Sequence, residues 1–524
     1  MLLLVVALFL SAVMEYEIVP TVAPRFPIKT SAFPRNFLPA HGFHLPMLKR
    51  FNSSQWTPSC AAHLLNRAGF GGSPAEVQAL YALGLNRAVE AMLSGSEDDD
   101  LFPPPTLTPP KELFEEMRAA RSMATEEQKR EAQQMARRQQ AEQMRATRAW
   151  WLDRMRYTSY PLREKMTLFW HGHFATGVDK VRAAYLMWQQ NETFRARALG
   201  SFRSLAKEVS RDPAMMRYLD LQQSNREKPN ENFARELMEL FLLGEGVRYT
   251  EKDIKESARA FTGYRIDQQS GGFVFQKRQF DPTDKTFMGR TGPHDGDAII
   301  DIILDQPESS AFIGRKLWVF FAAENPSPAI VQNVAGQLRG SNYDVKATLR
   351  EIFLSEEFYS PKVVRSQIKS PVQWIIQTSR VLEAPLPSQA ALETSMSQLG
   401  QVLFAPPNVK GWEGGRAWIS SSTLLFRYNL AGYIVSGKAP ALDGFRRGAG
   451  SVEIPLAKIA PPELRKNPEA LCDAVSQRLL NAKLEESERK RIIAYLREHG
   501  EKIDDPALRD FLYLMMSTPD FQLS

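Results

Sequence analysis

Hydrophobic side chains recur at helical spacing along most of this chain. In Ser73–Gly84, a Ser-Pro-Ala-Glu capping box precedes Val77, Leu80 and Tyr81, which are spaced i, i+3 and i+4. A cap at Thr125, in Thr125-Glu126-Glu127-Gln128, and another N-terminal cap at Thr250 mark further helix starts. Helical signals extend over residues 110–150, 161–174, 180–265, 296–322, 327–338, 345–355, 367–382 and 461–524. Helix is therefore predicted to dominate the fold.

One segment departs from the helical pattern. Residues 266–293 are rich in Gly, Gln and Asp and contain Phe273-Val274-Phe275, which predicts a small β-hairpin. Strands and helices do not alternate along the chain, which disfavours a parallel α/β sheet. The predicted fold class is mostly α, with one large, irregular multi-helix domain over residues 58–524 and a small β-hairpin insertion.

The N-terminal segment 1–57 has a different character. Leu2–Val13 is an apolar run of about a dozen residues, too short for a membrane span of about 20 but typical of a signal peptide. A Pro-rich, partly disordered leader follows over residues 14–57. We predict export to the periplasm or the extracellular space. The alternative is a mis-assigned start of a cytoplasmic protein, because no Lys or Arg precedes the run and no clean cleavage site follows it. No other segment suits a transmembrane span.

Charge and cysteine content narrow the function classes. Lys and Arg number 66 against 60 Asp and Glu, and this mild excess of +6 over 524 residues favours no nucleic-acid partner. Cys60 and Cys472 are too few for a Cys-rich metal site, and they form either two separate thiols or one bridge. Walker A, nucleophile-elbow, dinucleotide and His-Glu-x-x-His motifs are all missing, which disfavours the enzymes that depend on them.

A basic stretch lies in the long helical segment at 110–150. Lys129–Arg148 contains Arg130, Arg137, Arg138 and Arg145. Such a stretch either contacts an anionic partner or forms the solvated face of a long helix. We favour the solvated face, because charge runs mostly serve solvation.

The strongest candidate chemistry lies in Pro229–Phe241. At 100° per residue, Asn232, Arg235, Glu236 and Glu239 fall on one face of a helix whose other face is apolar. Carboxylates at i and i+3 can share a proton or reach one metal ion. We therefore predict Glu236, Glu239 and Arg235 as catalytic residues, with Asn232 beside them. The alternative is a solvated face with local ion pairs.

Two histidines form a second candidate. His171 and His173 lie one residue apart among large aromatic residues. On a regular helix they point about 200° apart, whereas in an extended segment they lie on one side, and Gly172 permits a break. With the carboxylates they predict a His/carboxylate site for a divalent iron, manganese or zinc ion. The alternative is two structural histidines.

Tryptophans mark an irregular Gly/Pro loop at residues 405–418. Trp412 and Trp418 either form a platform that binds a sugar or peptide substrate, or anchor the loop in the core. His294 precedes a helix start, where Asp295 or Asp297 is expected to cap. A role for His294 as a third metal ligand has less support.

Several longer motifs, in this order, resemble the bacterial family catalogued as domain of unknown function 1800 (DUF1800). The resemblance covers roughly residues 58–435 and is expected to extend through the tail to the C-terminus. It is carried by His63–Gly71 (HLLNRAGFG), Glu164–Phe174 (EKMTLFWHGHF), Asn230–Leu240 (NENFARELMEL), Tyr249–Tyr264, Lys285–Gly289 (KTFMG) and Pro406–Trp412 (PPNVKGW).

This resemblance implies a large, mainly helical bacterial protein, often exported. It also implies a partner, since members often look paired with an exported family that resembles the alkaline phosphatase/sulfatase fold. Similar proteins often show a His-Asp pair just before the Lys-Thr-Phe-x-Gly segment, whereas this chain has Phe280-Asp281 there. That difference removes the matching third histidine.

Two hypotheses follow for the function. In the first, His171, His173, Glu236 and Glu239 form a polar or metal-binding pocket of an exported protein, with enzymatic activity on an envelope or extracellular substrate. In the second, the protein is a non-catalytic secretion or assembly partner that uses the basic stretch and the Trp loop as contact surfaces. Convergence of the four residues in one pocket would favour the first. The sequence specifies neither a reaction nor an oligomeric state.

Overall fold

The computed structural model describes residues 48–95, 101–437, 452–500 and 503–524. The predicted signal segment and most of the leader lie outside these residues. The described part is mostly α, which confirms the predicted fold class. Cys60 and Cys472 are both free thiols.

The N-terminal helices begin at the sites that their capping residues mark. They are η1 (Ser53–Gln55), α2 (Pro58–Ala68), α3 (Pro74–Ala82) and α4 (Leu85–Leu93). Ser73 and Glu76 form the capping box predicted for α3. Proline stands at the first position of α2 and α3, where its missing N–H is no loss.

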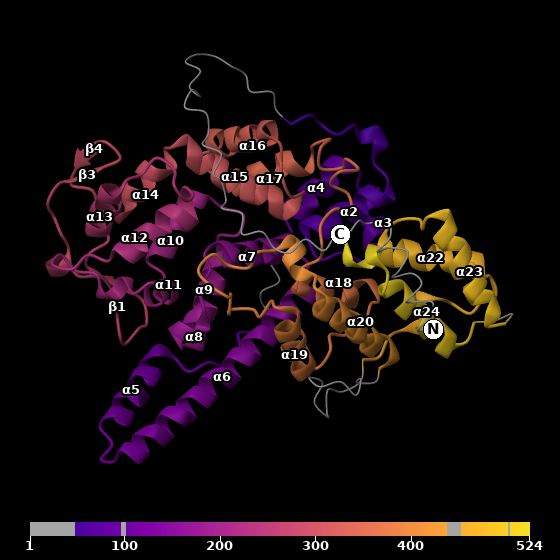
Figure 1. Ribbon diagram of the computed structural model, residues 1–524, viewed down its shortest axis with the longest axis horizontal. Coiled ribbons are helices and arrows are strands. Elements are labelled where there is room, and N and C mark those ends of the chain that lie inside the picture. The colour runs from indigo at the N-terminus through magenta and orange to yellow at the C-terminus, as the bar shows by residue number, and fades with distance from the viewer. Residues whose placement is uncertain (1–47, 96–100, 438–451, 501–502) are drawn as a thin grey trace.

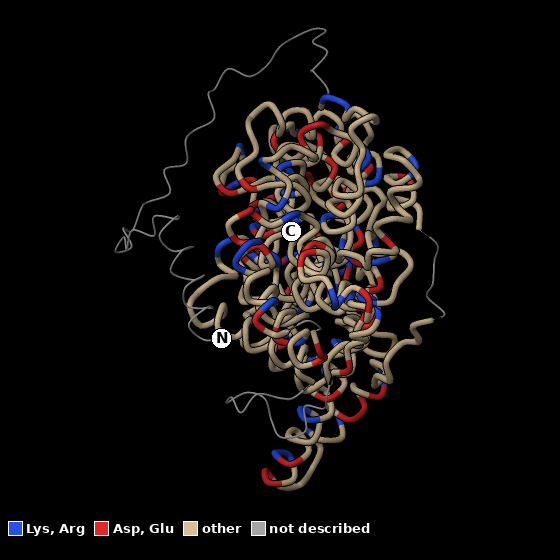
Figure 2. Tube along the Cα trace, turned by 90° about the vertical axis from the view of Figure 1, so that its right-hand side faces the viewer, with Lys and Arg blue, Asp and Glu red and all other residues tan. Residues whose placement is uncertain are grey.

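Two helices form an arm that projects from the body of the molecule. They are α5 (Pro110–Arg121) and the 32-residue α6 (Glu126–Tyr157), which starts at the capping box of Thr125 and Gln128. The arm, defined here as residues 110–143, extends away from the other helices in both Figure 1 and Figure 2. The remainder of α6 enters the core through Trp151, Leu152 and Met155.

Helix α7 (Pro161–His173) lies near the middle of the molecule in Figure 1. Nearly all of its side chains are buried, as in a helix covered on every side. It packs on α9 (Ala184–Ala196), and the short α8 (Val178–Val181) connects the two. Its residues contribute to both hydrophobic clusters of the described core: Met166 and Trp170 to one, Leu168 to the other. The single domain over residues 58–524 stays a prediction.

The segment 202–353 lies to the left of α7 and above it in Figure 1. Its helices are α10 (Phe202–Ser210), α11 (Pro213–Tyr218), η3 (Leu221–Gln223), α12 (Glu231–Glu236), the π-helix η4 (Leu237–Leu242), α13 (Glu251–Ala260), η5 (Lys277–Gln279), α14 (Gly296–Leu304), α15 (Pro307–Phe321), α16 (Pro328–Gly340) and α17 (Val345–Phe353). Thr250, the predicted N-terminal cap, opens α13 and forms a capping box with Asp253.

Strand structure in the described residues consists of two short antiparallel hairpins in place of the one predicted. Strand β1 (Tyr264–Ile266) pairs with β2 (Phe273–Phe275), and Tyr264 lies opposite Phe275. Strand β3 (Lys285–Phe287) pairs with β4 (Arg290–Gly292) through a tight turn at Met288 and Gly289. Both turn residues have positive φ, 46° and 79°, as a two-residue hairpin turn of this kind requires.

The C-terminal helices lie on the right in Figure 1. They are α18 (Pro371–Val381), α19 (Gln389–Leu399), η6 (Gly415–Trp418), α20 (Ser421–Ser436), α21 (Leu456–Ile459), η7 (Leu464–Lys466), α22 (Pro468–Leu480), α23 (Glu486–Glu498), α24 (Asp505–Met516) and η8 (Pro519–Gln522). None of the helices described here combines the length and the hydrophobicity that a membrane crossing needs.

Candidate functional site

The helix with the predicted acidic residues changes its winding between Glu236 and Leu237. The Asn230 side chain caps α12 by accepting from the backbone N–H groups of Asn232 and Phe233, at 3.0 and 3.3 Å. From Leu237 onward the chain continues as the π-helix η4. π-Helices are rare and occur frequently at functional sites. Asn232 itself is exposed at the first turn.

Arg235 joins this helix to its neighbour. Its guanidinium makes two hydrogen bonds of 2.9 Å to the carboxylate of Glu251 on α13 and lies 3.5 Å from Glu239. Arg235 is about one-third exposed and Glu251 is largely exposed. These are the local ion pairs that the alternative interpretation of this face expects.

Glu236 and Glu239 form part of a half-exposed patch of charged residues. Burial, and after it the Glu239 carboxylate, raise the pKa of Glu236, while Lys410 acts in the opposite direction. Lys410 donates a hydrogen bond of 2.6 Å to Glu245. Burial and a hydrogen bond with Glu239 raise the pKa of Tyr249 to about 12. The patch thus holds two neighbouring carboxylates, one of which retains its proton to higher pH than usual.

His173, on the buried helix α7, contacts the π-helix that continues from Glu236. Its Nε2 lies 2.9 Å from the carbonyl oxygen of Phe241, and its Nδ1 lies 3.1 Å from Nζ of Lys316 on α15. A carbonyl oxygen only accepts, so Nε2 carries the proton and Nδ1 accepts from Lys316. Lys316 also donates to the carbonyl of Leu240. Burial, followed by the Lys316 charge, lowers the pKa of His173 well below its ordinary value. The ring is therefore neutral, and protein groups engage both nitrogens.

His171 faces a different part of the core. Its Nε2 lies 3.0 Å from Nδ2 of Asn191, whose Oδ1 accepts from Arg195 at 2.5 Å. The Arg195 bond fixes the amide orientation, so Asn191 donates to His171. Aromatic rings of Trp151, Phe194 and Phe404 surround the imidazole. Burial, followed by Arg195, lowers its pKa to about 3.

The structure does not place the two histidines side by side. Helix α7 continues through Gly172 to His173, so the extended geometry that a shared ion needs is absent here. Only His173 contacts the helix of Glu236 and Glu239, through the Phe241 carbonyl. Over the described residues, no three His, Cys, Asp or Glu side chains gather as a metal site would require.

The Trp loop covers the end of α7. Gly411 has φ +85°, and a Cβ added there would lie 2.2 Å from the carbonyl oxygen of Gly172. Trp418 is buried, and Trp412 is half-buried with its Nε1 enclosed and without a hydrogen-bond partner among the described residues. The loop thus packs backbone to backbone on α7, and Trp418 offers no exposed ring.

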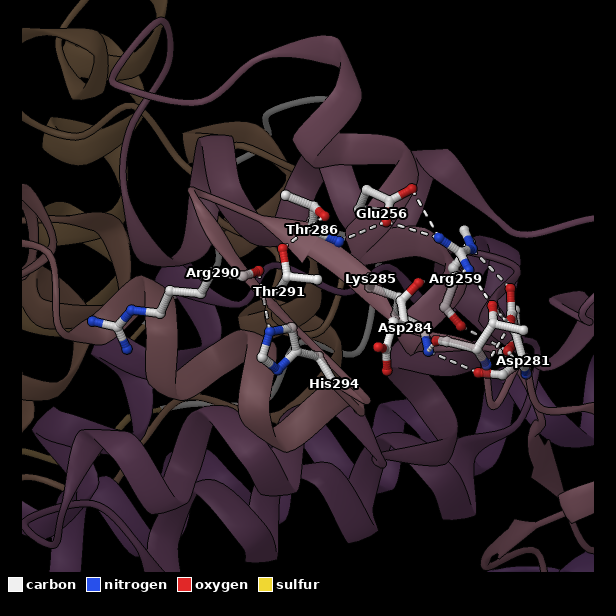
Figure 3. Close-up of polar contacts among 11 residues, drawn as sticks. Glu256, Arg259, Asp281, Asp284, Lys285, Thr286, Arg290, Thr291 and His294 are labelled. Atoms are coloured by element: carbon white, nitrogen blue, oxygen red, sulfur yellow. Dashed lines mark hydrogen bonds and ion pairs between the residues drawn. The ribbon is translucent and has the colours of Figure 1, made fainter.

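The segment that replaces the His-Asp pair is held by charged side chains (Figure 3). Arg259 donates to Asp281 at 2.7 Å and to Glu256 at 2.8 Å. Nζ of Lys285 donates to the carbonyl oxygens of Asp281 and Thr283, at 2.7 and 2.9 Å. The ammonium group of Lys285 thus binds two carbonyl oxygens of this loop.

His294 lies apart from both α7 histidines. Its Nε2 is 3.2 Å from the carbonyl of Arg290 at the exposed end of β4 (Figure 3), and Asp295 caps α14 as predicted.

Sequence patterns did not reveal Lys316, Lys410 or Tyr249. Lys316 follows Arg315 in the otherwise apolar middle of α15, where a basic pair gives only a weak signal, and it lies 143 residues from His173 in the chain. Lys410 and Tyr249 belong to separate loops whose approach to η4 depends on the whole fold.

Comparison with known proteins gives one match. A family model described as "Protein of unknown function (DUF1800)" matches residues 63–523, and this confirms the resemblance predicted from the motifs. No curated protein and no solved structure matches significantly.

Proposed function

The chain belongs to the DUF1800 family, and we propose that it is a non-catalytic docking protein whose arm binds an acidic partner protein. The observation that carries this proposal is a row of arginines on the arm. Arg130, Arg137, Arg138 and Arg145 are all exposed. At 100° per residue they lie within a sector of about 100°, and they span about 22 Å of helix.

These arginines are available for a partner. None of the four has an ion pair in the described part of the chain, although Glu131 and Glu142 flank the row. The side of α6 opposite the row is half-buried at Ala132, Ala136 and Gln140, and Gln140 accepts from the backbone N–H of Ala184 at the start of α9. Unpaired guanidinium groups bind carboxylates in a planar, two-point geometry.

The base of the arm is fixed, which suits a docking role. Gln139 and Gln143 donate to the hydroxyl of Thr108, at 3.1 and 2.7 Å. Arg148 donates to the carbonyl of Leu403 and to the Glu393 carboxylate, at 2.9 and 3.0 Å. A rigid element that presents charge needs little ordering when a partner binds.

The family resemblance supplies a candidate partner, an exported protein of the alkaline phosphatase/sulfatase fold. Mixing the purified full chain with that protein from the same organism should give saturable binding that weakens as salt is raised. Changing Arg130, Arg137, Arg138 and Arg145 to Glu should abolish binding, whereas the same four changes to Lys should leave weaker binding that still depends on salt, because lysine keeps the charge but not the two-point geometry. Binding that survives charge reversal would exclude the arm as the docking surface.

A second candidate function, acid–base chemistry at Glu236 and Glu239, is favoured by the raised pKa of Glu236. An acid that keeps its proton beside an ionised neighbour is a common catalytic arrangement. Arg235 would orient Glu239, from which it lies 3.5 Å. A substrate screen should then find an activity that Glu236→Gln removes and that Glu231→Gln, on the first turn of α12, leaves intact. Equal activity of both variants would exclude this role.

A metal-assisted form of this chemistry, and export of the protein, remain proposals. A divalent ion at Nδ1 of His173 would have to replace the ammonium of Lys316. Mass spectrometry of the native protein would show whether the apolar N-terminal segment is removed.

A further inference from the structure

A cavity of about 450 Å³ opens between four elements far from the acidic patch. It lies where the start of α10, the end of α14, strand β4 and the end of α16 meet. Three of its lining residues are arginines from three different elements: Arg203 of α10, Arg290 of β4 and Arg339 of α16. Asp305 is the one acidic residue of the lining.

The cavity has an excess of positive charge. Arg203 and Arg290 share the carboxylate of Asp305, at 3.4 and 3.0 Å. Arg203 also pairs with Asp301 at 2.7 Å, which Lys207 shares at 2.8 Å. These two acids face the four cations Arg203, Lys207, Arg290 and Arg339, and the excess is therefore two charges.

Donors of two arginines are left over after these pairs form. Arg339 has no ion-pair partner among the described residues, and it is exposed at the cavity rim. Nε of Arg203 is buried and also lacks a hydrogen-bond partner in the described part of the chain. A buried N–H donor without a partner is unfavourable, because it has already lost its hydrogen bonds to water. A ligand acceptor that reaches Nε of Arg203 therefore forms a hydrogen bond without having to desolvate that donor.

The floor of the cavity holds Arg203 in place. The Arg203 guanidinium lies 5.6 Å from the centre of the buried Tyr343 ring. The Tyr343 hydroxyl donates to the carbonyl of Leu304 at 2.6 Å, and this bond fixes the ring. A guanidinium stacked on an aromatic ring is ordered before any ligand arrives.

The turn beneath the floor is strained. Asn342 and Tyr343, two consecutive non-glycine residues, have φ values of 54° and 64°. Left-handed conformations of such residues are unfavourable and cluster at functional sites. Here the turn directs the Tyr343 ring under Arg203 while Asn342 stays at the rim.

From these features we infer that the cavity binds a phosphate dianion, either free or carried by a small monoester. The two excess positive charges would be neutralised by a dianion. The planar guanidinium group of arginine can also donate two parallel hydrogen bonds to phosphate oxygens. The carboxylate of Asp305 occupies part of the position that the phosphate would take, and it therefore competes with the ligand. The volume exceeds that of phosphate alone and lies in the range of small-molecule sites.

Binding can be measured by titration calorimetry on the full chain with inorganic phosphate, glucose 6-phosphate and unphosphorylated glucose. We expect saturable binding of phosphate, of glucose 6-phosphate or of both, and none of glucose. Tighter binding of glucose 6-phosphate would identify a monoester site, and equal or tighter binding of inorganic phosphate would identify a site for the free ion. Failure of both to bind at about 10 mM, a level that detects even millimolar affinity, would overturn the proposal.

Substitutions of the lining residues test which side chains bind the phosphate. Arg339→Ala and Arg290→Ala should each weaken binding about tenfold, because each removes a charged donor. Asp305→Asn should strengthen binding several-fold, because it removes the competing carboxylate. Asp284→Asn, at the other end of the same hairpin from Arg290 in Figure 3, should change nothing.

Circular dichroism and thermal melting should confirm that each variant folds. Unchanged binding in both arginine variants, or an Asp305→Asn variant no tighter than the wild type, would overturn the assignment.

Discussion

Nζ of Lys316 lies 3.1 Å from Nδ1 of His173, while Nε2 of the same ring bonds to the carbonyl oxygen of Phe241 at 2.9 Å. The imidazole thus links α7, α15 and η4 in the buried core. His173→Phe would leave the Phe241 carbonyl without its donor and the lysine without one acceptor. We expect the variant to lose about 1–3 kcal/mol of unfolding free energy in urea denaturation. His499→Ala, at an exposed histidine, should change it by less than about 0.5 kcal/mol.

The same contact decides how well a metal ion can bind at His173. Lys316→Met removes the ammonium that faces Nδ1, and like charges a few Å apart repel by about 1 kcal/mol or more. We therefore expect this variant to bind Zn²⁺ about tenfold more tightly than the wild type in titration calorimetry. Lys410→Met, which removes an exposed lysine from the neighbouring patch, serves as the control. Equal affinity of the Lys316 variant and the wild type would show that zinc does not bind at His173.

Two ion pairs of similar length should differ greatly in their effect on stability. Glu164 is fully buried and accepts from Arg195 at 2.7 Å and from Trp151 at 2.9 Å. Glu164→Ala removes the buried carboxylate that Arg154 and Arg195 share, which should reduce the unfolding free energy by about 3–5 kcal/mol. Arg235→Ala breaks the half-exposed pair with Glu251 and should reduce it by less than about 1 kcal/mol. Similar losses in urea denaturation would contradict this difference in burial.

Lys165 should give the protein a distinctive dependence on pH. Its Nζ lies 5.0 Å from the ring centre of Phe70 and 5.7 Å from that of Phe320. Burial, followed by Arg67, lowers its pKa from 10.5 to about 7. Between these two values the unfolded chain binds a proton that the folded protein does not. The titration of Lys165 therefore does not reduce the unfolding free energy above pH 10.5, and it reduces it progressively as the pH is lowered from 10.5 to about 7.

Comparison with Lys165→Met isolates this effect from those of other buried groups. The unfolding free energy of the variant minus that of the wild type should increase by about 1.4 kcal/mol for each unit by which the pH is lowered from 10.5 to 7. Thermal melts at several pH values provide the measurement, and the exposed Lys362→Met is the control. A difference independent of pH would show that Lys165 stays charged in the folded protein.

Glu236 should reduce stability at neutral pH. Its pKa is raised by burial and by Glu239, so the stability that it contributes is complete below about pH 4.5 and decreases as the pH rises through the folded value. Glu236→Gln should then be more stable than the wild type at pH 7, by less than about 1 kcal/mol because the group is half exposed. At pH 4 the two should be equal. Glu231→Gln should be neutral at both pH values, and a destabilised Glu236→Gln would show that the charge is already well compensated.

Helix starts were predictable because their causes are local. The capping boxes at Ser73, Thr125 and Thr250 each involve residues three positions apart, so the sequence alone indicates them. Gly172 shows the opposite case. The conformational freedom of the Gly172 backbone would permit a break between the two histidines. The helix stays intact because α7 is packed on every side.

The surroundings of the candidate site were less predictable. Nothing within Asn230–Leu240 announces a change from α- to π-winding, which shifts the later residues around the axis. The Lys316–His173 contact and the Arg203–Asp305–Arg290 pairs join residues that lie in separate elements, and they exist only once the helices have packed. A single hairpin was expected at 266–293, whereas β1 begins earlier, at Tyr264, and a second hairpin follows.

The continuous α6 has a mechanical consequence. Its 32 residues form an unbroken rod of about 48 Å. Among the described residues, α5 lies beside the outer part, and the inner end holds Trp151, whose ring lies 4.7 Å from that of His171. A sideways pull on the tip therefore acts as a torque about the anchored end. The interior around Trp151 and His171 bears that load, so tension applied outside the body is transmitted to its centre.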